Sequence, residues 1–241
     1  MAFKFRLINI AFVTHVLLIA LISPFLLLTA VPVYWFGGKK RSDHYIHILG
    51  AFLSRNLLFT FGIRVDVQGI ENLPKSNNLC FISNHQGLAD IPIIVGYIPK
   101  TVGFIAKKEL GRIPFLNIWM GVLGCVLIDR KNLRNSLHTI EKGIHQIEKG
   151  HPMVIFPEGT RSRNANMGNF RPGSFKLVTG ANALAVPVSI SGSYKVVEER
   201  GILTASKIKL TIHPAIDVST LSEIEKANLH QKVKEIILSG L

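Results

Sequence analysis

The sequence contains little cysteine and little negative charge for its length of 241 residues. Cys80 and Cys125 are its only cysteines, and each lies inside an apolar run, LCFI and GCVLI. A free cysteine in such surroundings usually packs as a small hydrophobic side chain. We therefore expect a reducing compartment and no disulfide framework.

The shortage of acidic side chains indicates an anionic partner. Lys and Arg total 28 against 15 Asp and Glu, which gives a formal net charge of +13. An anionic membrane surface, a phosphorylated substrate and nucleic acid all fit this charge. Nucleic acid fits least, because the basic residues are spread along the chain and the mean hydropathy is +0.32. The sequence also has no zinc finger, RNA-recognition signature or basic heptad helix.

Several catalytic motifs are missing as well. The sequence has no G-x-S-x-G elbow, and the contexts of Ser174 and Ser193 do not suggest a nucleophile. It has no P-loop, no dinucleotide fingerprint and no H-E-x-x-H motif, and no carboxylate cluster accompanies His44 and His47. We therefore expect neither an enzyme nucleophile nor a metal or other cofactor.

The longest apolar segment runs from Leu7 to Phe36, 30 residues without a formal charge. About 20 such residues span a bilayer, whereas the apolar part of a cleaved signal peptide has only about 7 to 15. Pro24 and Pro32 should each kink or interrupt a helix. Basic residues on both flanks give no clear orientation, so a re-entrant element with both ends in the cytoplasm and a tilted, kinked span both remain open.

An amphipathic helix should follow the Gly37-Gly38 break. Its apolar positions recur at three- and four-residue steps, at Ile46, Leu49, Leu53, Leu57 and Phe61, with His47 and Arg55 off this stripe. The apolar face could lie on the membrane or pack on the rest of the protein. Both alternatives stay open from the sequence.

From residue 64 onward, short apolar runs alternate with helical patterns, which predicts an α/β fold with a mostly parallel central sheet flanked by helices. We divide the chain into an N-terminal membrane-associated helical segment, residues 1–62, and an α/β domain, residues 63–241. Polar clusters follow four expected strands: NHQGLAD at 84–90, KKELGR at 107–112, DRKN at 129–132 and PEGTRSR at 157–163. Such clusters converge at the carboxyl edge of a parallel sheet.

His85 and Asp90 form a candidate base and orienting acid. A carboxylate bonded to one imidazole nitrogen fixes the tautomer and leaves the other nitrogen free to accept a proton. On a continuous helix the two residues would point about 140° apart, so a turn at Gly87 is needed. The alternative is a loop in which Asp90 only stabilises a helix N-terminus. If the pair is catalytic, the substrate itself must supply the nucleophile, most simply a hydroxyl.

The segment FPEGTRSR suits a phosphate monoester, because Gly159 permits close approach, Thr160 offers a hydroxyl and Arg161 a bidentate guanidinium. Glu158 cannot hold a phosphate, so we expect it to pair with Arg161 or to bind a substrate hydroxyl. The alternative is a surface turn with an exposed ion pair. Positive charge at the same edge could come from Lys107, Lys108 and Arg130, which could equally be ordinary solvated side chains.

The two motifs NHQGLAD and FPEGTRS resemble the H-x-x-x-x-D and F-P-E-G-T-R-S motifs of the glycerolipid acyltransferases, in particular the 1-acyl-glycerol-3-phosphate acyltransferases. FIAKKELGRIPF and VPVSISGS resemble the second and fourth blocks of that family, in the same order. The similarity covers residues from about 64 to 215, and the apolar N-terminus is like that of bacterial members.

By this resemblance, His85 would be the base and Asp90 its partner. The glycerol-phosphate portion would be bound by Glu158, Gly159, Thr160 and Arg161 with Lys107 or Lys108. The implied reaction transfers an acyl group from acyl-coenzyme A or acyl-carrier protein to the sn-2 hydroxyl of lysophosphatidic acid, giving phosphatidic acid without a cofactor. The implied location is the bacterial inner membrane, with the catalytic domain facing the cytoplasm.

Two positions depart from the family pattern. Gly87 stands where many relatives carry serine, and Asn117 where a glycine is common, which puts the chain-length preference in doubt. Two other functions remain open: acyl transfer to glycerol 3-phosphate or another lysolipid, and non-catalytic binding of membrane lipids through the basic face.

Overall fold

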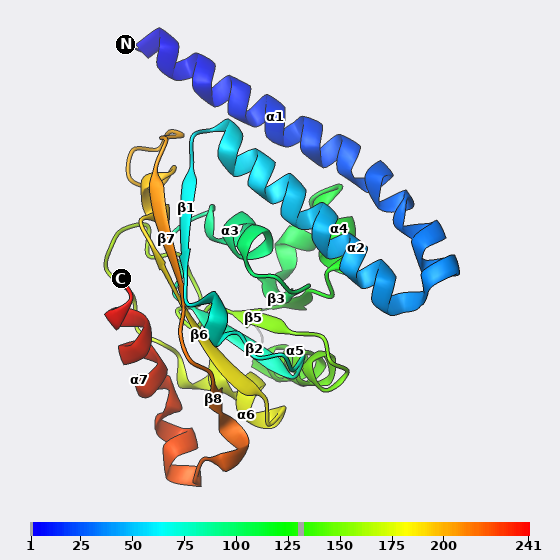
Figure 1. Ribbon diagram of the computed structural model, residues 1–241. Coiled ribbons are helices and arrows are strands. Elements are labelled where there is room, and N and C mark those ends of the chain that lie inside the picture. The colour runs from blue at the N-terminus through cyan, green and yellow to red at the C-terminus, as the bar shows by residue number, and fades with distance from the viewer. Residues whose placement is uncertain (1, 130–132) are drawn as a thin grey trace.

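The computed structural model describes the backbone of residues 2–129 and 133–241 and the side chains of residues 10–129 and 138–241. One sheet organises the fold (Figure 1), and within the described residues its order is β1-β7-β6-β2-β5-β3-β4, with β8 paired to β6. The strands are β1 Arg64–Gln68, β2 Leu79–Ser83, β3 Gly103–Lys107, β4 Val126–Ile128, β5 Met153–Ile155, β6 Leu184–Ser191, β7 Lys207–Ile212 and β8 Ile216–Asp217.

The sheet is mostly parallel, as the alternation of strand and helix patterns predicts. Strands β2, β5, β3 and β4 run parallel to one another, and β6 is parallel to β2. The antiparallel pairs are β6 with β7 and β6 with β8. The carboxyl ends of β2, β3, β4 and β5 therefore lie along one edge, where the four polar clusters were expected to converge.

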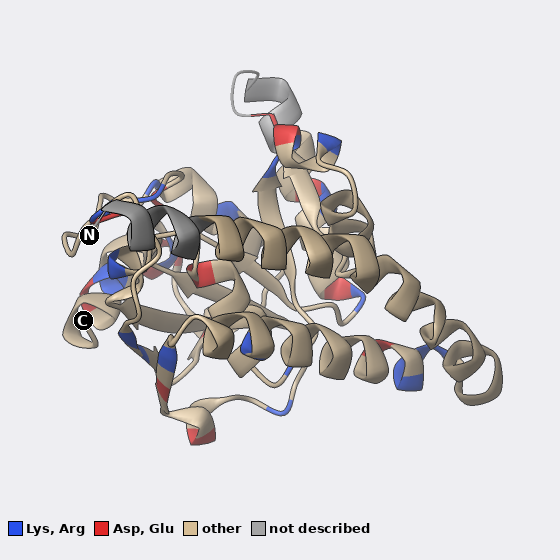
Figure 2. Ribbon diagram, turned by 90° about the horizontal axis from the view of Figure 1, so that it is seen from above, with Lys and Arg blue, Asp and Glu red and all other residues tan. Residues whose placement is uncertain are grey.

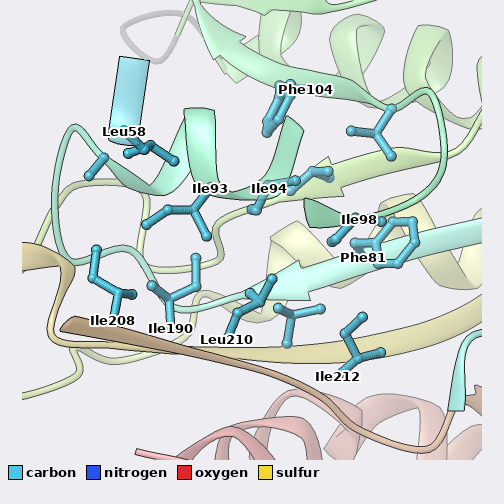
Figure 3. Close-up of a cluster of buried hydrophobic side chains, with 14 of the residues drawn as sticks. Leu58, Phe81, Ile93, Ile94, Ile98, Phe104, Ile190, Ile208, Leu210 and Ile212 are labelled. Carbon is cyan, nitrogen blue, oxygen red and sulfur yellow. The ribbon is translucent and has the colours of Figure 1, made fainter. Parts of the chain in front are cut away.

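Helices cover both faces of the sheet. They are α1 Ala2–Leu28, α2 Ala30–Thr60, α3 Asp90–Tyr97, α4 Leu116–Val122, α5 Leu133–Glu148, α6 Lys176–Gly180 and α7 Glu223–Ser239. One apolar core joins α2 and α3 to the sheet and includes Leu58, Ile93, Phe81, Ile190 and Leu210 (Figure 3). A second core on the other face joins α5, α6 and α7 to the sheet through Ile147, Leu177, Leu229, Val233 and Ile237.

The N-terminal segment forms a pair of long helices that run side by side (Figure 1). Phe12, near the start of α1, packs edge-to-face against Phe61, just after α2, with ring centroids 5.0 Å apart, so the pair is antiparallel. The chain turns at Thr29 and not at a proline: Pro24 lies inside α1. Pro32 lies in the first turn of α2, where a missing N–H is tolerated. Neither proline ends its helix, so of the predicted kink or interruption the interruption was wrong.

The expected glycine break is present, because Gly38 inside α2 has a non-helical backbone with φ 74° and ψ 175°. Beyond it, α2 packs on the α/β domain: Gly50 and Ala51 are buried, and Arg55 Nε donates to the carbonyl of Gly96 in α3 at 2.6 Å. On the same helix Phe52 and Phe59 remain exposed. Packing on the protein and an exposed apolar surface thus coexist on α2.

Residues 10–28 of α1 are apolar and largely exposed. In the part of the chain that the structure describes, Ile10–Leu28 is the one helical stretch long and apolar enough to cross a membrane, with a mean hydropathy of 2.4. The stretch contains no Asp, Glu, Lys or Arg, and α1 is tan beyond its grey start in Figure 2. Its exposed side chains include Leu17, Leu21, Phe25 and Leu28. Because water disfavours such a surface, α1 indicates association with a membrane.

Candidate active site

The loops after β2 and β5 are held together by backbone hydrogen bonds. Ser162 N–H donates to the carbonyl of His85 at 2.8 Å, and Arg163 N–H donates to that of Gln86 at 3.1 Å. Strands β2 and β5 are parallel neighbours, so both loops leave the sheet at the same edge. The structure therefore brings NHQGLAD and FPEGTRSR into contact, as the sequence predicts.

His85 and Asp90 form a direct pair. Nδ1 of His85 lies 2.7 Å from Oδ2 of Asp90, the first residue of α3. The same oxygen accepts the N–H groups of Gln86 and Gly87 at 2.7 and 2.9 Å, and Asp90 is fully buried. With Nδ1–H donated to the carboxylate, Nε2 carries the lone pair. The His85 side chain, which carries Nε2, is 18% exposed and therefore partly accessible to solvent.

Aromatic side chains form one wall beside His85. Its imidazole stacks on Phe156, with centroids 4.1 Å apart and an interplanar angle of 19°. Phe156 in turn stacks with Phe104 of β3 at 6.5 Å. The ring of His85 is thereby fixed in one plane between a carboxylate and an apolar surface.

Glu158 binds backbone groups and not Arg161. Its Oε1 accepts the N–H of His85 at 2.6 Å, and its Oε2 accepts the N–H of Gly168 at 2.8 Å. Burial raises the pKa of Glu158, although these two N–H groups act in the opposite direction. The predicted ion pair with Arg161 was wrong, because two N–H donors already satisfy the buried carboxylate.

Arg161 pairs with Glu198, a residue that the sequence patterns did not single out. Its Nη1 donates to Glu198 Oε1 at 2.9 Å, and the two side chains are 29% and 5% exposed. Thr160 lies exposed at the tip of the same loop. Gly159 has φ 75°, and a Cβ there would lie 3.0 Å from Cζ of Arg171. Arg171 thus places a second guanidinium against this loop, which the motif pattern also missed.

The two lysines at the carboxyl end of β3 have partners of their own. Lys107 Nζ lies 3.7 Å from Glu109 Oε1, and Lys108 forms an ion pair with Asp129. Lys107 is the last residue of β3 and Lys108 follows it, and β3 is separated from β2 by β5. Arg130, the third cation expected at this edge, lies outside the described residues. Positive charge is therefore present along the edge, and Arg161 is linked to the His85 loop through Glu198, which also accepts the N–H of Leu88.

Asn84 and Gln86 secure the loop on its other side, toward β6. Asn84 exchanges two hydrogen bonds with the backbone of Ile190, both at 2.8 Å. Gln86 Oε1 accepts the N–H groups of Gly192 and Ser193 at 2.9 and 3.2 Å. Buried polar side chains require such partners. Their positions beside His85, directly after a strand in which every residue is buried, were a usable signal for this supporting role.

Two apolar cavities lie beside the N-terminal helices α1 and α2. One, of about 500 Å³, is lined by Leu88 and Ala89 of the His85 loop and by Phe104, Met120, Cys125 and Leu203, among others. The other, of about 560 Å³, is lined by residues of α1, α2, α3 and α4, including Leu17, Ala20 and Leu53, and by Phe115 just before α4. Trp119 lines both cavities, and its Nε1 donates to Ser23 Oγ of α1 at 2.7 Å. Apolar space thus adjoins the residues that follow His85.

Comparisons with known proteins agree with this arrangement. Residues 64–191 match the family model described as "Acyltransferase". The chain is 32% identical over 185 residues to a 1-acyl-sn-glycerol-3-phosphate acyltransferase of Borreliella burgdorferi, covering 76% of this chain and 74% of that protein. It is 30% identical over 181 residues to the chloroplastic 1-acyl-sn-glycerol-3-phosphate acyltransferase BAT2 of Brassica napus, covering 74% of this chain but only 51% of the plant protein.

A solved structure is similar over nearly the whole chain. It is the crystal structure of the 1-acyl-sn-glycerophosphate acyltransferase PlsC from Thermotoga maritima, with a TM-score of 0.81 and 29% sequence identity. The match covers 98% of this chain and 95% of that one, so it includes the two N-terminal helices as well as the α/β domain.

Proposed function

Because the chain belongs to the acyltransferase family, we propose that it transfers an acyl group from a thioester to the sn-2 hydroxyl of 1-acyl-glycerol-3-phosphate, forming phosphatidic acid. The contact between His85 Nδ1 and buried Asp90 Oδ2, at 2.7 Å, carries this proposal. The similar proteins from Borreliella burgdorferi and Brassica napus are named for this acceptor, and their names do not specify the acyl donor.

The chemistry follows from the orientation of the imidazole. Nε2 of His85 takes the proton of the sn-2 hydroxyl as its oxygen attacks the thioester carbonyl, and Asp90 stabilises the imidazolium that forms. The tetrahedral intermediate collapses with cleavage of the carbon–sulfur bond. The departing sulfur then takes the proton from Nε2, which restores the neutral base. Because the thioester is already activated, the reaction needs no covalent enzyme intermediate.

We assign the phosphate of the acceptor to the loop after β5. Arg161 offers the remaining N–H donors of its guanidinium, and Thr160 offers its hydroxyl beside it. The N–H of Gly159 donates to the carbonyl of Phe156 at 3.0 Å, so Gly159 contributes close approach of the ligand and not a donor. Arg171, packed against Gly159, adds a second positive charge. Lys107 and Lys108 contribute to the field along the same edge. Glu158 supports binding indirectly, because its two oxygens hold the His85 and Gly168 backbones in place.

The apolar cavities supply room for acyl chains, and α1 supplies access to a lipid surface. The cavity of about 500 Å³ begins at Leu88 and Ala89, next to the catalytic loop. A lysolipid held there would keep its phosphate near the basic edge and its chain among apolar side chains. We place the α/β domain on the cytoplasmic side, where thioester donors such as acyl-coenzyme A and acyl-carrier protein are found.

An acyltransferase assay with the full chain in liposomes tests the proposal. Each of the two thioester donors is crossed with lysophosphatidic acid, glycerol 3-phosphate and a lysolipid without a phosphate monoester. We expect efficient transfer to lysophosphatidic acid and a loss of at least about 100-fold in His85→Ala, since general-base catalysis contributes about 10² to 10⁴-fold. Near-normal transfer by folded His85→Ala would refute the role of the base, and preference for another acceptor would refute the substrate.

A further inference from the structure

Glu198 connects the two loops that carry the candidate chemistry. It follows β6 by several residues, in the segment KVVEER. A single oxygen, Oε1, accepts Nη1–H of Arg161 at 2.9 Å and the backbone N–H of Leu88 at 2.7 Å. Leu88 lies between His85 and Asp90, so this carboxylate joins the catalytic loop directly to the guanidinium expected to bind phosphate.

The surroundings of Glu198 are those of a fixed side chain. It is only 5% exposed, whereas the neighbouring Glu199 is 42% exposed. A buried carboxylate is costly without a cationic partner, and Arg161 is the partner that the structure provides. Among the residues that the structure describes, the second oxygen, Oε2, is buried without a hydrogen-bond partner. Glu198 therefore sits in one orientation that is determined by Arg161 and Leu88.

Gly87 provides the space for this carboxylate. A Cβ at position 87 would lie 2.5 Å from Oε2 and 2.9 Å from Cδ of Glu198. Both distances are shorter than van der Waals contact allows, so any larger residue at 87 would displace the Glu198 side chain. Gly87 of NHQGLAD and Glu198 of KVVEER thus pack directly against each other, and the contact requires a glycine at position 87.

We propose that Glu198 is a positioning residue for Arg161, holding the guanidinium so that its other N–H donors face the phosphate of the acceptor. A free arginine loses rotamer freedom when it binds an anion, and a guanidinium already fixed through Nη1 loses less of it. Because the Glu198 carboxylate also accepts the N–H of Leu88, it fixes the distance between the Arg161 guanidinium and the His85 loop. The inference rests on the proposed function, since it concerns the acceptor of that reaction.

Steady-state kinetics of the full chain in liposomes, with lysophosphatidic acid varied at a saturating donor concentration, test this role. Glu198→Gln removes the charge but keeps an acceptor for Leu88 N–H, and Glu199→Gln is the control one residue away. We expect Glu198→Gln to raise the KM for lysophosphatidic acid about ten-fold, which is the change in affinity expected when one charge-assisted hydrogen bond is lost. The kcat and the KM for the donor should be unchanged. Glu199→Gln should leave all three at the wild-type values.

A double-mutant comparison separates positioning from general support of the fold. If Glu198 acts through Arg161, Glu198→Gln should have no further effect on the acceptor KM in an Arg161→Ala background. Gly87→Ala, which keeps the charge but displaces the carboxylate, should raise the acceptor KM as Glu198→Gln does.

Three results would overturn the inference: an unchanged or lower acceptor KM in Glu198→Gln, the same increase in the Arg161→Ala background, or a loss of kcat with every acceptor. Wild-type protein that does not acylate lysophosphatidic acid would instead refute the proposed function, and this is visible before any variant is compared.

Discussion

Nδ1 of His85 lies 2.7 Å from Oδ2 of Asp90, and that oxygen also accepts the backbone N–H groups of Gln86 and Gly87. Three donors converge on one buried carboxylate oxygen, so the loop that bears the proposed base is folded around Asp90. The five-residue spacing works because residues 85–89 form a turn and α3 begins only at Asp90.

Asp90→Asn should lower kcat by at least about 100-fold while the fold is retained. A neutral amide no longer stabilises the imidazolium, and its NH₂ group can reverse the imidazole tautomer, which leaves Nε2 protonated and unable to act as a base. The measurement is single-turnover acyl transfer to lysophosphatidic acid. Thermal unfolding of the same preparation controls for misfolding, and a kcat within a few-fold of wild type would contradict the assigned role.

Glu158→Gln should weaken the contact between the His85 loop and the segment at Gly168. Both oxygens of Glu158 accept backbone N–H groups, so a Gln side chain must turn its NH₂ toward one of them. An unpaired buried N–H costs about 1 to 3 kcal/mol. We expect a thermal midpoint lower by about 2 to 4 °C per kcal/mol for a chain of this size. Glu235→Gln, an exposed position on α7, is the control, and equal midpoints for the two variants would argue against the role of Glu158.

Trp119→Leu should shift the acyl-chain preference toward longer chains. Trp119 lines both apolar cavities and is held by its hydrogen bond to Ser23, so a smaller side chain joins the two spaces. The measurement is the relative kcat/KM for donors of increasing chain length. The only other tryptophan, Trp35, is 78% exposed, so Trp35→Leu is the matched control. An unchanged chain-length profile in Trp119→Leu would exclude these cavities as the chain site.

Much of the fold could be predicted because local patterns determined it. The apolar runs at LCFIS and MVI and the stripe of α5 specify strands and a helix by periodicity alone, and parallel pairing then brings NHQGLAD and PEGTRSR to one edge. The chain turns at Thr29 and continues as a helix through Pro32. An N–H in the first turn of a helix has no partner within the helix, so a proline there removes no hydrogen bond and does not mark the turn.

The partners of charged side chains could not be predicted in the same way. Glu158 and Arg161 are three residues apart and were expected to pair, but Glu158 is turned toward His85 N–H and Arg161 toward Glu198. Both outcomes depend on contacts between segments far apart in the chain, which no local spacing records. Gly87, a departure from the family pattern that put the chain-length preference in doubt, makes room for Glu198, a contact that the sequence did not indicate.

His213 should make the docking of the C-terminal helix sensitive to acid. Its Nε2 lies 2.7 Å from Oγ of Ser189, and that hydroxyl donates to the carbonyl of Ile237 in α7 at 2.7 Å. With the hydroxyl proton directed at Ile237, His213 donates through Nε2–H. Burial, with Lys209 nearby, lowers the pKa of His213 below its ordinary value of 6.5.

The folded state therefore keeps His213 neutral, while the unfolded chain takes up a proton as the pH falls below the ordinary histidine value. The stability that His213 contributes is present above that value and is lost as the pH falls toward the lowered folded pKa. We expect the thermal midpoint of the wild type to fall more than that of His213→Gln between about pH 7.5 and about pH 5.5, because glutamine keeps a donor for Ser189 but does not titrate. His138→Gln is the control, since His138 lies on α5 with its side chain 66% exposed and should retain the wild-type pH dependence. Parallel pH profiles for the wild type and His213→Gln would contradict this prediction. They would show that the unfolded chain binds a proton at His213 no more readily than the folded protein does.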